Sequence, residues 1–263
     1  MSFKNKIVWI TGASSGIGEA IAFALIKQGA VVIASSSSIE KLKASKAKAS
    51  NTEQFHIVPL DLNNADTIQP TAQQVIERFG RVDILINNAG ISQRSLVLET
   101  PIANYRKVME INYFGTVILT KAVLPQMIKQ GGGYLLCTSS IVGVFGFPLR
   151  SAYSAAKHAL HGFFESLRIE YYKQNIKVSI IIGGRINTAI SMNAITGNGL
   201  PYGKLDDGQK NGISSEKAAQ QILRGMQKSK REIRAGGKEL LMVTLKRRFP
   251  RIHFWIAKRI KAT

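Results

Sequence analysis

Short runs of consecutive apolar residues recur along the chain, and longer segments with helically spaced apolar residues separate them. The apolar runs are bounded by turn-forming residues and predict strands at 6–10, 30–34, 55–58, 82–86, 134–137 and 177–182. The segments between and after them predict helices at 16–28, 64–79, 101–129, 151–173 and 214–228, followed by a last strand at 231–235. Continuous apolar strands that alternate with helices are typical of a parallel sheet covered on both faces. The pattern therefore predicts a doubly wound α/β fold.

The composition fits one folded unit followed by a short tail. Of the 263 residues, 45% are hydrophobic and 20% are charged, which supports a large core and excludes an intrinsically disordered chain. No stretch rich in Pro, Gly and Ser divides the sequence, so we expect one domain at 1–239 and a helical tail at 240–263. The single cysteine, Cys137, predicts a buried thiol in a reducing compartment. We find neither a leader-like segment nor a membrane-spanning stretch, and we therefore expect a cytoplasmic protein.

Basic residues are concentrated at the C-terminal end of the chain. Residues 226–263 contain twelve Lys or Arg residues and two Glu residues, which accounts for half of the formal net charge of +20. The stretch 240–262 combines seven of these cations with aromatic and aliphatic residues and has no acidic residue, and Pro250 predicts two helical pieces. Two interpretations remain open: helices that pack on the protein with solvated charges, and a peripheral contact with an anionic membrane surface. We see no nucleic-acid-binding motif and expect no specific nucleic-acid partner.

A glycine-rich turn, TGASSGIG at residues 11–18, follows the first predicted strand and opens the first predicted helix. Gly12 allows the tight turn, and Gly16 and Gly18 let the backbone approach a pyrophosphate at the helix N-terminus. Such a turn by itself also serves close packing in many proteins. Its position directly after the first strand predicts a dinucleotide site in a Rossmann-type fold, with further contacts from Ser14, Ser15 and Ile17.

The end of the second strand bears on the choice of nucleotide. It reads ASSSSIEK at 34–41, with no acidic residue before Glu40. NAD sites usually place an acidic residue here, on the ribose 2′-hydroxyl. Because Ser36 and Ser37 do not repel a 2′-phosphate and Lys41 is close in sequence, we expect NADP(H) to be favoured, with NAD(H) as the alternative.

Polar residues also follow the third and fourth predicted strands, at Asp61 and Leu62 in PLDL and at Asn88, Ala89 and Gly90 in NNAG. Each group alone has a structural interpretation, as a helix cap or as a turn. Because the carboxyl ends of parallel strands meet at one edge of the sheet, these groups and the glycine turn predict one nucleotide-binding edge.

The stretch SAYSAAK places Tyr153 and Lys157 four residues apart on a predicted helix. Residues at this spacing are neighbours on one helix face, about 5–6 Å apart at Cβ. A nearby ammonium favours the phenolate and lowers the pKa of a tyrosine from its usual value of about 10. The pair therefore predicts acid–base chemistry, and the structural alternative is an ordinary surface helix.

As a set, these motifs resemble the short-chain dehydrogenase/reductase family over about residues 4–236. TGASSGIG, NNAG, Asn112 in MEINYFG, Ser140 and YSAAK occur in the family's order and at its spacing. The resemblance implies that Tyr153 is the general acid in carbonyl reduction and the base in alcohol oxidation. It implies that Lys157 binds the nicotinamide ribose and lowers the tyrosine pKa. It also implies that Ser140 holds the substrate oxygen and that Asn112 anchors a water in a proton relay.

The stretch after the sixth predicted strand both follows and departs from that family pattern. In GGRINT, Gly183 stands where the family usually has proline, which predicts a more flexible loop. Gly184, Ile186 and Thr188 still match, which implies contact with the carboxamide end of the cofactor. The Gly- and Asn-rich segment at about 189–213 predicts a mobile substrate lid. The stretches RSAYSAAKHAL, NYFGTVILTKAVLP and SMNAITGNGLPYG resemble the member-7-type branch of the family.

Together, these residues and the resemblance predict an NADP(H)-dependent oxidoreductase that interconverts a carbonyl and a secondary alcohol on a small-molecule substrate. The alternative is a binding protein on the same fold, either a non-catalytic nucleotide-binding regulator or a basic-surface binding protein. The resemblance implies a homodimer or homotetramer through the helices at 101–129 and 151–173. We expect no metal site, because no Cys, His and carboxylate cluster accompanies His158 and His161.

Overall fold

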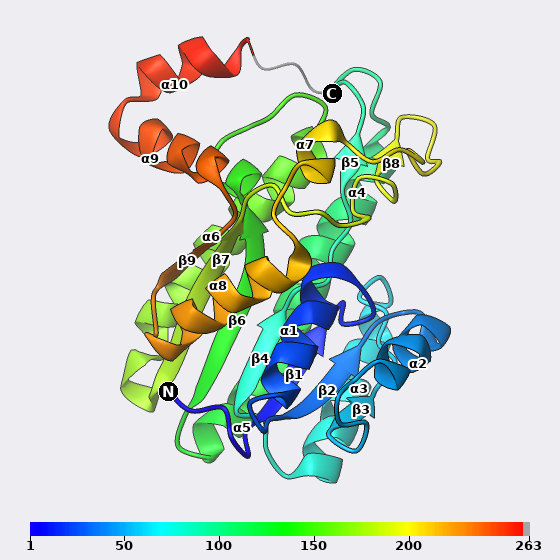
Figure 1. Cartoon of the computed structure of the whole chain (residues 1–263), viewed down its shortest axis with the longest axis vertical. Helices are drawn as coiled ribbons and strands as arrows, with labels where there is room; N and C mark the ends of the chain where they lie inside the picture. The colour runs from blue at the N-terminus through cyan, green and yellow to red at the C-terminus, as the bar shows by residue number, and fades with distance from the viewer. Residues whose placement is uncertain (260–263) are drawn as a thin grey trace.

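The computed structural model describes residues 1–259 and contains a seven-stranded parallel sheet (Figure 1). The strands are β1 (Ile7–Thr11), β2 (Val31–Ser35), β3 (Phe55–Ile57), β4 (Ile84–Asn87), β6 (Gly133–Ser140), β7 (Ile176–Gly183) and β9 (Glu232–Ala235). They lie in the order β3–β2–β1–β4–β6–β7–β9. The direction of winding changes between β1 and β4, where doubly wound sheets form their ligand crevice. The predicted Rossmann-type fold is confirmed.

Helices cover both faces of the sheet. On one face lie α1 (Gly16–Ile26), α2 (Ile39–Ala47) and α8 (Ser215–Gln227), and on the other lie α3 (Ala65–Phe79), α5 (Gly115–Lys129) and α6 (Ser151–Glu170). Strand β1 shows why the strands are apolar throughout: Val8 and Ile10 pack with α1, whereas Trp9 packs in the opposite core. All three are fully buried, and Trp9 Nε1 donates a hydrogen bond to Ser35 Oγ at 2.8 Å.

The helix predicted at 101–129 is not one regular α-helix. The chain forms α4 (Ile102–Met109), a π-helical turn η1 (Glu110–Phe114) and then α5. Asn112 lies in the π-helical turn, where its side chain exchanges two hydrogen bonds of 2.8 Å with the backbone N–H and C=O of Ile91. Single π-helical turns often occur at functional sites, and this one ties α4 and α5 to the loop that follows β4.

A second, two-stranded sheet lies beyond the carboxyl ends of the main strands. Its strands are β5 (Gln93–Arg94) and β8 (Ile195–Thr196), which pair in parallel. The segment 189–213 contains β8 and the short helix α7 (Asp207–Lys210). This small sheet therefore connects the segment predicted as a lid to the loop after β4 (Figure 1).

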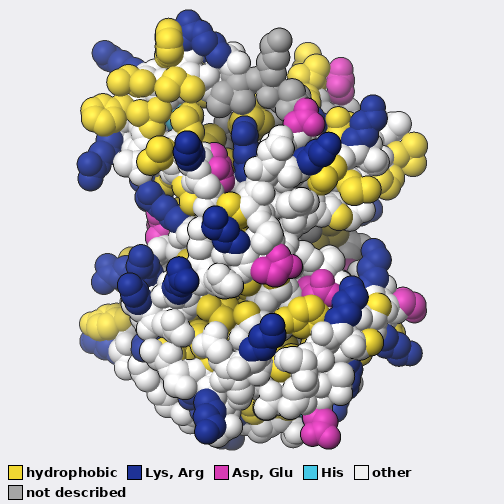
Figure 2. Space-filling view, in the orientation of Figure 1, with side chains coloured by type: hydrophobic (Ala, Val, Ile, Leu, Met, Phe, Trp, Pro, Cys, Tyr) yellow, Lys and Arg dark blue, Asp and Glu magenta, His cyan; other side chains and the backbone are white. Residues whose placement is uncertain are grey.

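After β9 the chain continues through η4 (Lys238–Leu240) into two helices, α9 (Leu241–Arg248) and α10 (Pro250–Ala257). The break predicted at Pro250 is confirmed, and the last four residues of the predicted tail, 260–263, lie outside the described residues. Val243 and His253 face inward, and the His253 ring packs on Phe145 with centroids 4.6 Å apart. Figure 2 shows hydrophobic side chains gathered over α9 and α10, with Lys and Arg side chains around them.

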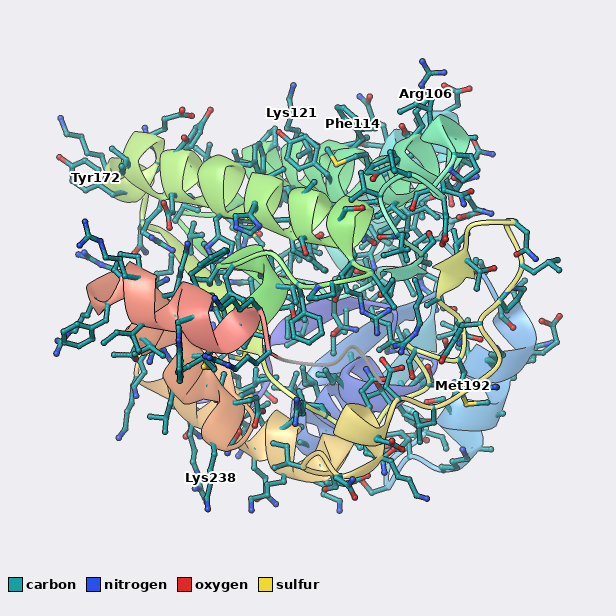
Figure 3. All side chains as sticks on the ribbon, turned by 90° about the horizontal axis from the view of Figure 1, so that it is seen from above. Arg106, Phe114, Lys121, Tyr172, Met192 and Lys238 are labelled. Carbon is teal, nitrogen blue, oxygen red and sulfur yellow. The ribbon has the colours of Figure 1, made fainter. Side chains whose placement is uncertain are left out.

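The outer surface of α5 and α6 also exposes apolar side chains. Phe114, just before α5, and Tyr172, in η3 (Tyr172–Gln174) after α6, both point outward (Figure 3). Within residues 1–259, no helix combines the length and the apolar character that crossing a membrane requires.

Candidate active site

A cavity of about 530 Å³ lies at the carboxyl edge of the main sheet. It extends from the end of β2 to the start of α6 and to the segment 183–193. The predicted cofactor residues that line it are Gly12, Ser14, Ser15, Gly16, Ile17, Ser36, Ser37, Asp61, Leu62, Asn88, Ala89, Gly90, Tyr153, Lys157, Gly184, Ile186 and Thr188. Residues from six separate stretches of the chain therefore meet at one cavity, as the strand-end positions predicted.

The glycine turn between β1 and α1 forms the floor of this cavity. Gly12 and Gly16 have φ angles of +66° and +57°, which favour glycine. Gly18 does not line the cavity, and a Cβ built there would lie 2.3 Å from the Gly12 carbonyl oxygen. The absence of a side chain at Gly18 therefore lets α1 pack closely against the turn.

At the end of β2, the cavity wall carries hydroxyls and a cation. Ser36, Ser37 and Lys41 line it, and Ser14 Oγ donates to Ser36 Oγ at 3.0 Å. Glu40 is absent from the wall, and its carboxylate accepts a hydrogen bond from Ser38 Oγ at 3.1 Å. This end of the cavity therefore has hydrogen-bond donors and a positive charge that could bind a phosphate, and the carboxylate of Glu40 is bound to the N-cap residue of α2.

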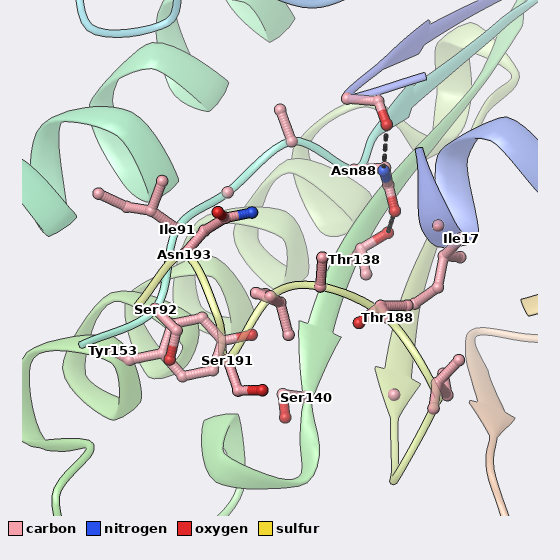
Figure 4. A pocket seen from close by; sticks show the side chains of 18 of the residues that line it. Ile17, Asn88, Ile91, Ser92, Thr138, Ser140, Tyr153, Thr188, Ser191 and Asn193 are labelled. Carbon is pink, nitrogen blue, oxygen red and sulfur yellow. Dashed lines mark hydrogen bonds between the residues drawn. The ribbon is translucent and has the colours of Figure 1, made fainter. Parts of the chain in front are cut away.

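Asn88, at the end of β4, holds three strand ends together. Its Nδ2 donates to the Thr11 carbonyl oxygen at 3.1 Å, and its Oδ1 accepts from Thr138 Oγ1 at 3.3 Å (Figure 4). Its side chain thus links β1 and β6 across β4, so the NNAG loop is held in a fixed position beside the glycine turn.

Tyr153, Ser140, Ser92 and Ser191 gather at the opposite end of the cavity (Figure 4). Lys157 is buried on the same helix face as Tyr153, with its Nζ 5.6 Å from the Tyr153 ring centre. Lys157 Nζ donates a hydrogen bond to the Thr138 carbonyl oxygen at 2.6 Å. Three of the four predicted catalytic side chains therefore lie together, whereas Asn112 lies behind the wall, bound to Ile91.

The electrostatics of this end differ from the expectation drawn from the Tyr–Lys spacing. Burial raises the pKa of Tyr153 to about 12, although the positive charge of Arg150 and a hydrogen bond with Ser140 both act to lower it. Burial also lowers the pKa of Lys157 to about 8. The expectation that Lys157 brings the tyrosine pKa below its usual value is wrong here. Desolvation outweighs the nearby charges, and the cation that opposes it is Arg150.

Sequence analysis assigned no role to two charged residues of the cavity wall, Arg150 and Asp206. Arg150 precedes α6 by one residue, and Asp206 lies in the segment 189–213. An arginine one helical turn before Tyr153 is visible in the sequence, but nothing local to Asp206 shows that it meets this arginine.

Glu239 was also missed, and its carboxylate binds the backbone of the GGRINT loop. Its Oε1 accepts hydrogen bonds from the backbone N–H of Arg185 at 2.6 Å and of Gly237 at 2.9 Å. A Cβ on Gly184 would lie 2.1 Å from this oxygen, so a larger residue there would displace the Glu239 carboxylate. The carboxylate thus joins the loop at Arg185 to the turn after β9.

The two histidines of α6 make ordinary structural contacts. His161 Nε2 lies 2.9 Å from Ser139 Oγ, and His158 Nδ1 lies 2.8 Å from the Ser154 carbonyl oxygen. Across residues 1–259, we find no group of three or more His, Cys, Asp or Glu residues placed to hold a metal ion.

Comparisons with known proteins agree with this geometry. Residues 6–198 match the short chain dehydrogenase family. The chain is 41% identical to a dehydrogenase/reductase SDR family protein 7-like of Anopheles gambiae over 262 residues, 97% of this chain and 83% of the relative. The structure of a short-chain dehydrogenase from Streptomyces avermitilis is similar with a TM-score of 0.82, 30% identity and 98% coverage of both chains. An alcohol dehydrogenase from Thermococcus sibiricus complexed with 5-hydroxy-NADP has a TM-score of 0.75 at 26% identity, covering 89% of this chain and 97% of that one.

Proposed function

Because the chain belongs to the short-chain dehydrogenase/reductase family, whose members are oxidoreductases acting on CH–OH groups, we propose that it interconverts a carbonyl and a secondary alcohol with NADP(H). The observation that carries the proposal is the convergence of Tyr153, Ser140 and Lys157 at one end of a cavity. The other end of the same cavity carries the glycine turn and the hydroxyls of β2.

The residues along the cavity fit a nicotinamide dinucleotide. We assign its pyrophosphate to the turn at 11–18 and its adenosine to Asp61 and Leu62. When bound, such a cofactor supplies a hydride to a carbonyl carbon or accepts one from an alcohol carbon. We favour NADP(H) because Ser36, Ser37 and Lys41 line the wall and Glu40, the acidic residue that follows β2, does not. The Thermococcus sibiricus relative complexed with 5-hydroxy-NADP supports a nicotinamide dinucleotide as the class of cofactor.

Tyr153 is our general acid and base. In carbonyl reduction its hydroxyl donates a proton to the substrate oxygen, and in alcohol oxidation it accepts that proton. Ser140, at the end of β6, is hydrogen-bonded with Tyr153 and holds the same substrate oxygen. A pKa of about 12 keeps Tyr153 protonated at neutral pH, which is the form that reduction requires.

Lys157 and Asn112 support this pair in different ways. Lys157 Nζ is held by the Thr138 carbonyl oxygen and lies close to Gly90, where a Cβ would be 3.4 Å away. This places the ammonium between the NNAG loop and Tyr153, where it can bind ribose hydroxyls. Both polar atoms of the Asn112 side-chain amide are hydrogen-bonded to the backbone of Ile91. We therefore assign this side chain to holding the loop after β4 in place.

The test is NADPH consumption with a panel of ketones, aldehydes and quinones. Wild type should turn over at least one of them, and Tyr153→Phe should lose at least about a hundredfold of that rate. Tyr172→Phe is the matched control, because Tyr172 is a largely exposed tyrosine far from the cavity wall. Equal turnover by Tyr153→Phe and wild type would refute the assigned role, and a preference for NADH would refute the cofactor choice.

Members of this family often assemble into oligomers, and we propose a homodimer or homotetramer that packs the outer surface of α5 and α6. Phe114 and Tyr172 are exposed aromatic residues on this surface (Figure 3), and Ile169, in α6, is exposed as well. A monomeric mass by light scattering would refute the assembly. If wild type is oligomeric, Phe114→Glu should shift the mass downward.

We also propose that α9 and α10 contact an anionic membrane surface. Phe254 and Trp255 are 69% and 55% exposed, and Phe249 and Ile252 lie exposed beside them. Basic residues surround these apolar side chains, which is the arrangement expected at an anionic lipid interface. Packing of a second copy of the chain on this surface would bring its concentrated positive charge against itself.

Vesicles separate the two interpretations of the tail. Wild type should co-sediment with phosphatidylserine-containing vesicles and much less with pure phosphatidylcholine vesicles. The double variant Phe254→Ser, Trp255→Ser should lose most of this binding. Leu98→Ser, which removes a fully exposed leucine elsewhere on the surface, should keep it. Unchanged binding by the double variant, or no binding by wild type, rejects the membrane contact.

A further inference from the structure

A buried carboxylate bridges two arginines at the substrate end of the cavity. Asp206 Oδ1 accepts a hydrogen bond from Arg94 Nη1, and its Oδ2 accepts one from Arg150 Nη2. None of the three side chains is more than 13% exposed. They come from three parts of the fold: β5, the residue before α6, and the segment 189–213.

Further contacts make this cluster a connection between the segment and the body of the protein. Arg150 Nη1 donates to the Gln93 carbonyl oxygen at 3.0 Å. The backbone N–H of Asp206 donates to Ser191 Oγ at 3.1 Å, and the Arg94 guanidinium lies 4.3 Å from the Tyr202 ring centre. Both ends of the segment are thus joined, through Asp206, to the helix that carries Tyr153.

Arg150 stands three residues before Tyr153 and lines the same cavity. The other groups that face Tyr153 are Lys157 on its own helix and Ser140 at the end of β6, and Asp206 lies across the cavity wall. The cluster of two arginines and one carboxylate has a net charge of one positive unit. Within it, the positive charge of Arg150 is the largest effect that opposes desolvation in setting the Tyr153 pKa.

We propose that Arg150 is a positioning residue that holds the segment 189–213 closed over Tyr153 through Asp206 and keeps a positive charge beside the tyrosine hydroxyl. Opening the segment separates Asp206 from Arg150, so closure and the charge near Tyr153 are linked. Breaking one partner of a buried ion pair leaves an uncompensated buried charge, which favours the open form. The electrostatic half of this inference rests on the proposed oxidoreductase function, whereas the closure half does not.

Closure is tested by hydrogen exchange on the full chain without substrate, and the result does not depend on activity. Asp206→Asn and Arg150→Gln should both speed amide exchange in peptides from 189–213, by about tenfold or more. The control is Asp207→Asn, because Asp207 is the neighbouring acid, is exposed and does not line the cavity. Exchange equal to wild type in both variants overturns the proposed latch.

The charge is tested by the pH profile of kcat/KM for alcohol oxidation. Arg150→Gln should move its rising limb to higher pH by about one unit. Arg150→Lys keeps the positive charge but cannot bind both Asp206 and the Gln93 carbonyl oxygen as the guanidinium does. In this variant the rising limb of the pH profile should stay near its wild-type pH, while amide exchange in 189–213 still increases. A limb that moves equally in the Gln and Lys variants, or in neither, overturns the electrostatic role. Activity that is absent from every form, with the exchange pattern intact, refutes the proposed function and leaves the latch standing.

Discussion

Tyr153 should remain protonated well above the pH at which an ordinary tyrosine ionises. Its burial raises the pKa to about 12 against the opposing effects of Arg150 and Ser140. With that pKa, about 1% of the side chain is ionised at pH 10, where half of an unperturbed tyrosine is ionised. The difference is large enough to measure on one residue among seven tyrosines.

The assay is an ultraviolet titration of tyrosinate in the protein without added cofactor, with Tyr153→Phe subtracted from wild type. We expect almost no difference absorbance up to pH 10. Tyr172→Phe is the control, because it removes one tyrosine outside the cavity wall and shows whether the loss of a single tyrosine is resolved in the difference spectrum. Circular dichroism at each pH verifies that the fold persists. A wild-type minus Tyr153→Phe midpoint at or below pH 10 would refute the conclusion that desolvation outweighs the cations around this hydroxyl.

Three further predictions concern buried groups. Burial lowers the pKa of Lys157 from 10.5 to about 8. Between pH 8 and pH 10.5 the Lys157 amine is therefore protonated in the unfolded chain and neutral in the folded chain, so the stability of the fold rises with pH over this range. In urea unfolding, Lys157→Met should therefore gain up to about 3 kcal/mol at pH 7, with a smaller gain by pH 10.5; an equal gain at both would contradict the lowered pKa. Gly18→Ala should weaken NADPH binding at least about tenfold by calorimetry, because its Cβ would meet the Gly12 carbonyl oxygen, whereas Gly162→Ala, in open space, should not. Burial raises the pKa of Cys137 to about 12, so the folded chain should resist thiol reagents, and rapid labelling before unfolding would argue against this burial.

Most of the sheet could be predicted from the sequence because each central strand is buried on both faces and reads as a continuous apolar run. The strands β5 and β8 could not, since two-residue strands carry no periodic pattern and β5 consists of Gln93 and Arg94. The π-helical turn was also invisible, because an extra residue in a helix preserves the apolar spacing on either side. The turn is seen only in the folded chain, at Glu110–Phe114, where Asn112 also binds Ile91.

Within the site, local motifs were informative and long-range pairings were not. The glycine turn and the Tyr153–Lys157 spacing are readable because each lies within one turn or one helix. The Arg150–Asp206 contact joins residues 56 apart in the sequence, so no local pattern identifies it. The direction of the Tyr153 pKa depends on desolvation in the folded chain, which spacing along a helix does not report.

The pairing of β5 with β8 means that two segments a hundred residues apart share one backbone ladder, with Gln93 opposite Ile195 and Arg94 opposite Thr196. Anyone who wishes to redesign substrate choice by grafting loops from a relative should transplant both segments as a unit. If only one of the two segments were grafted, its strand would have to pair with a strand from the other protein. The β5–β8 pairing would then be lost, and with it the position of the 189–213 segment over the cavity, before any new selectivity could be observed.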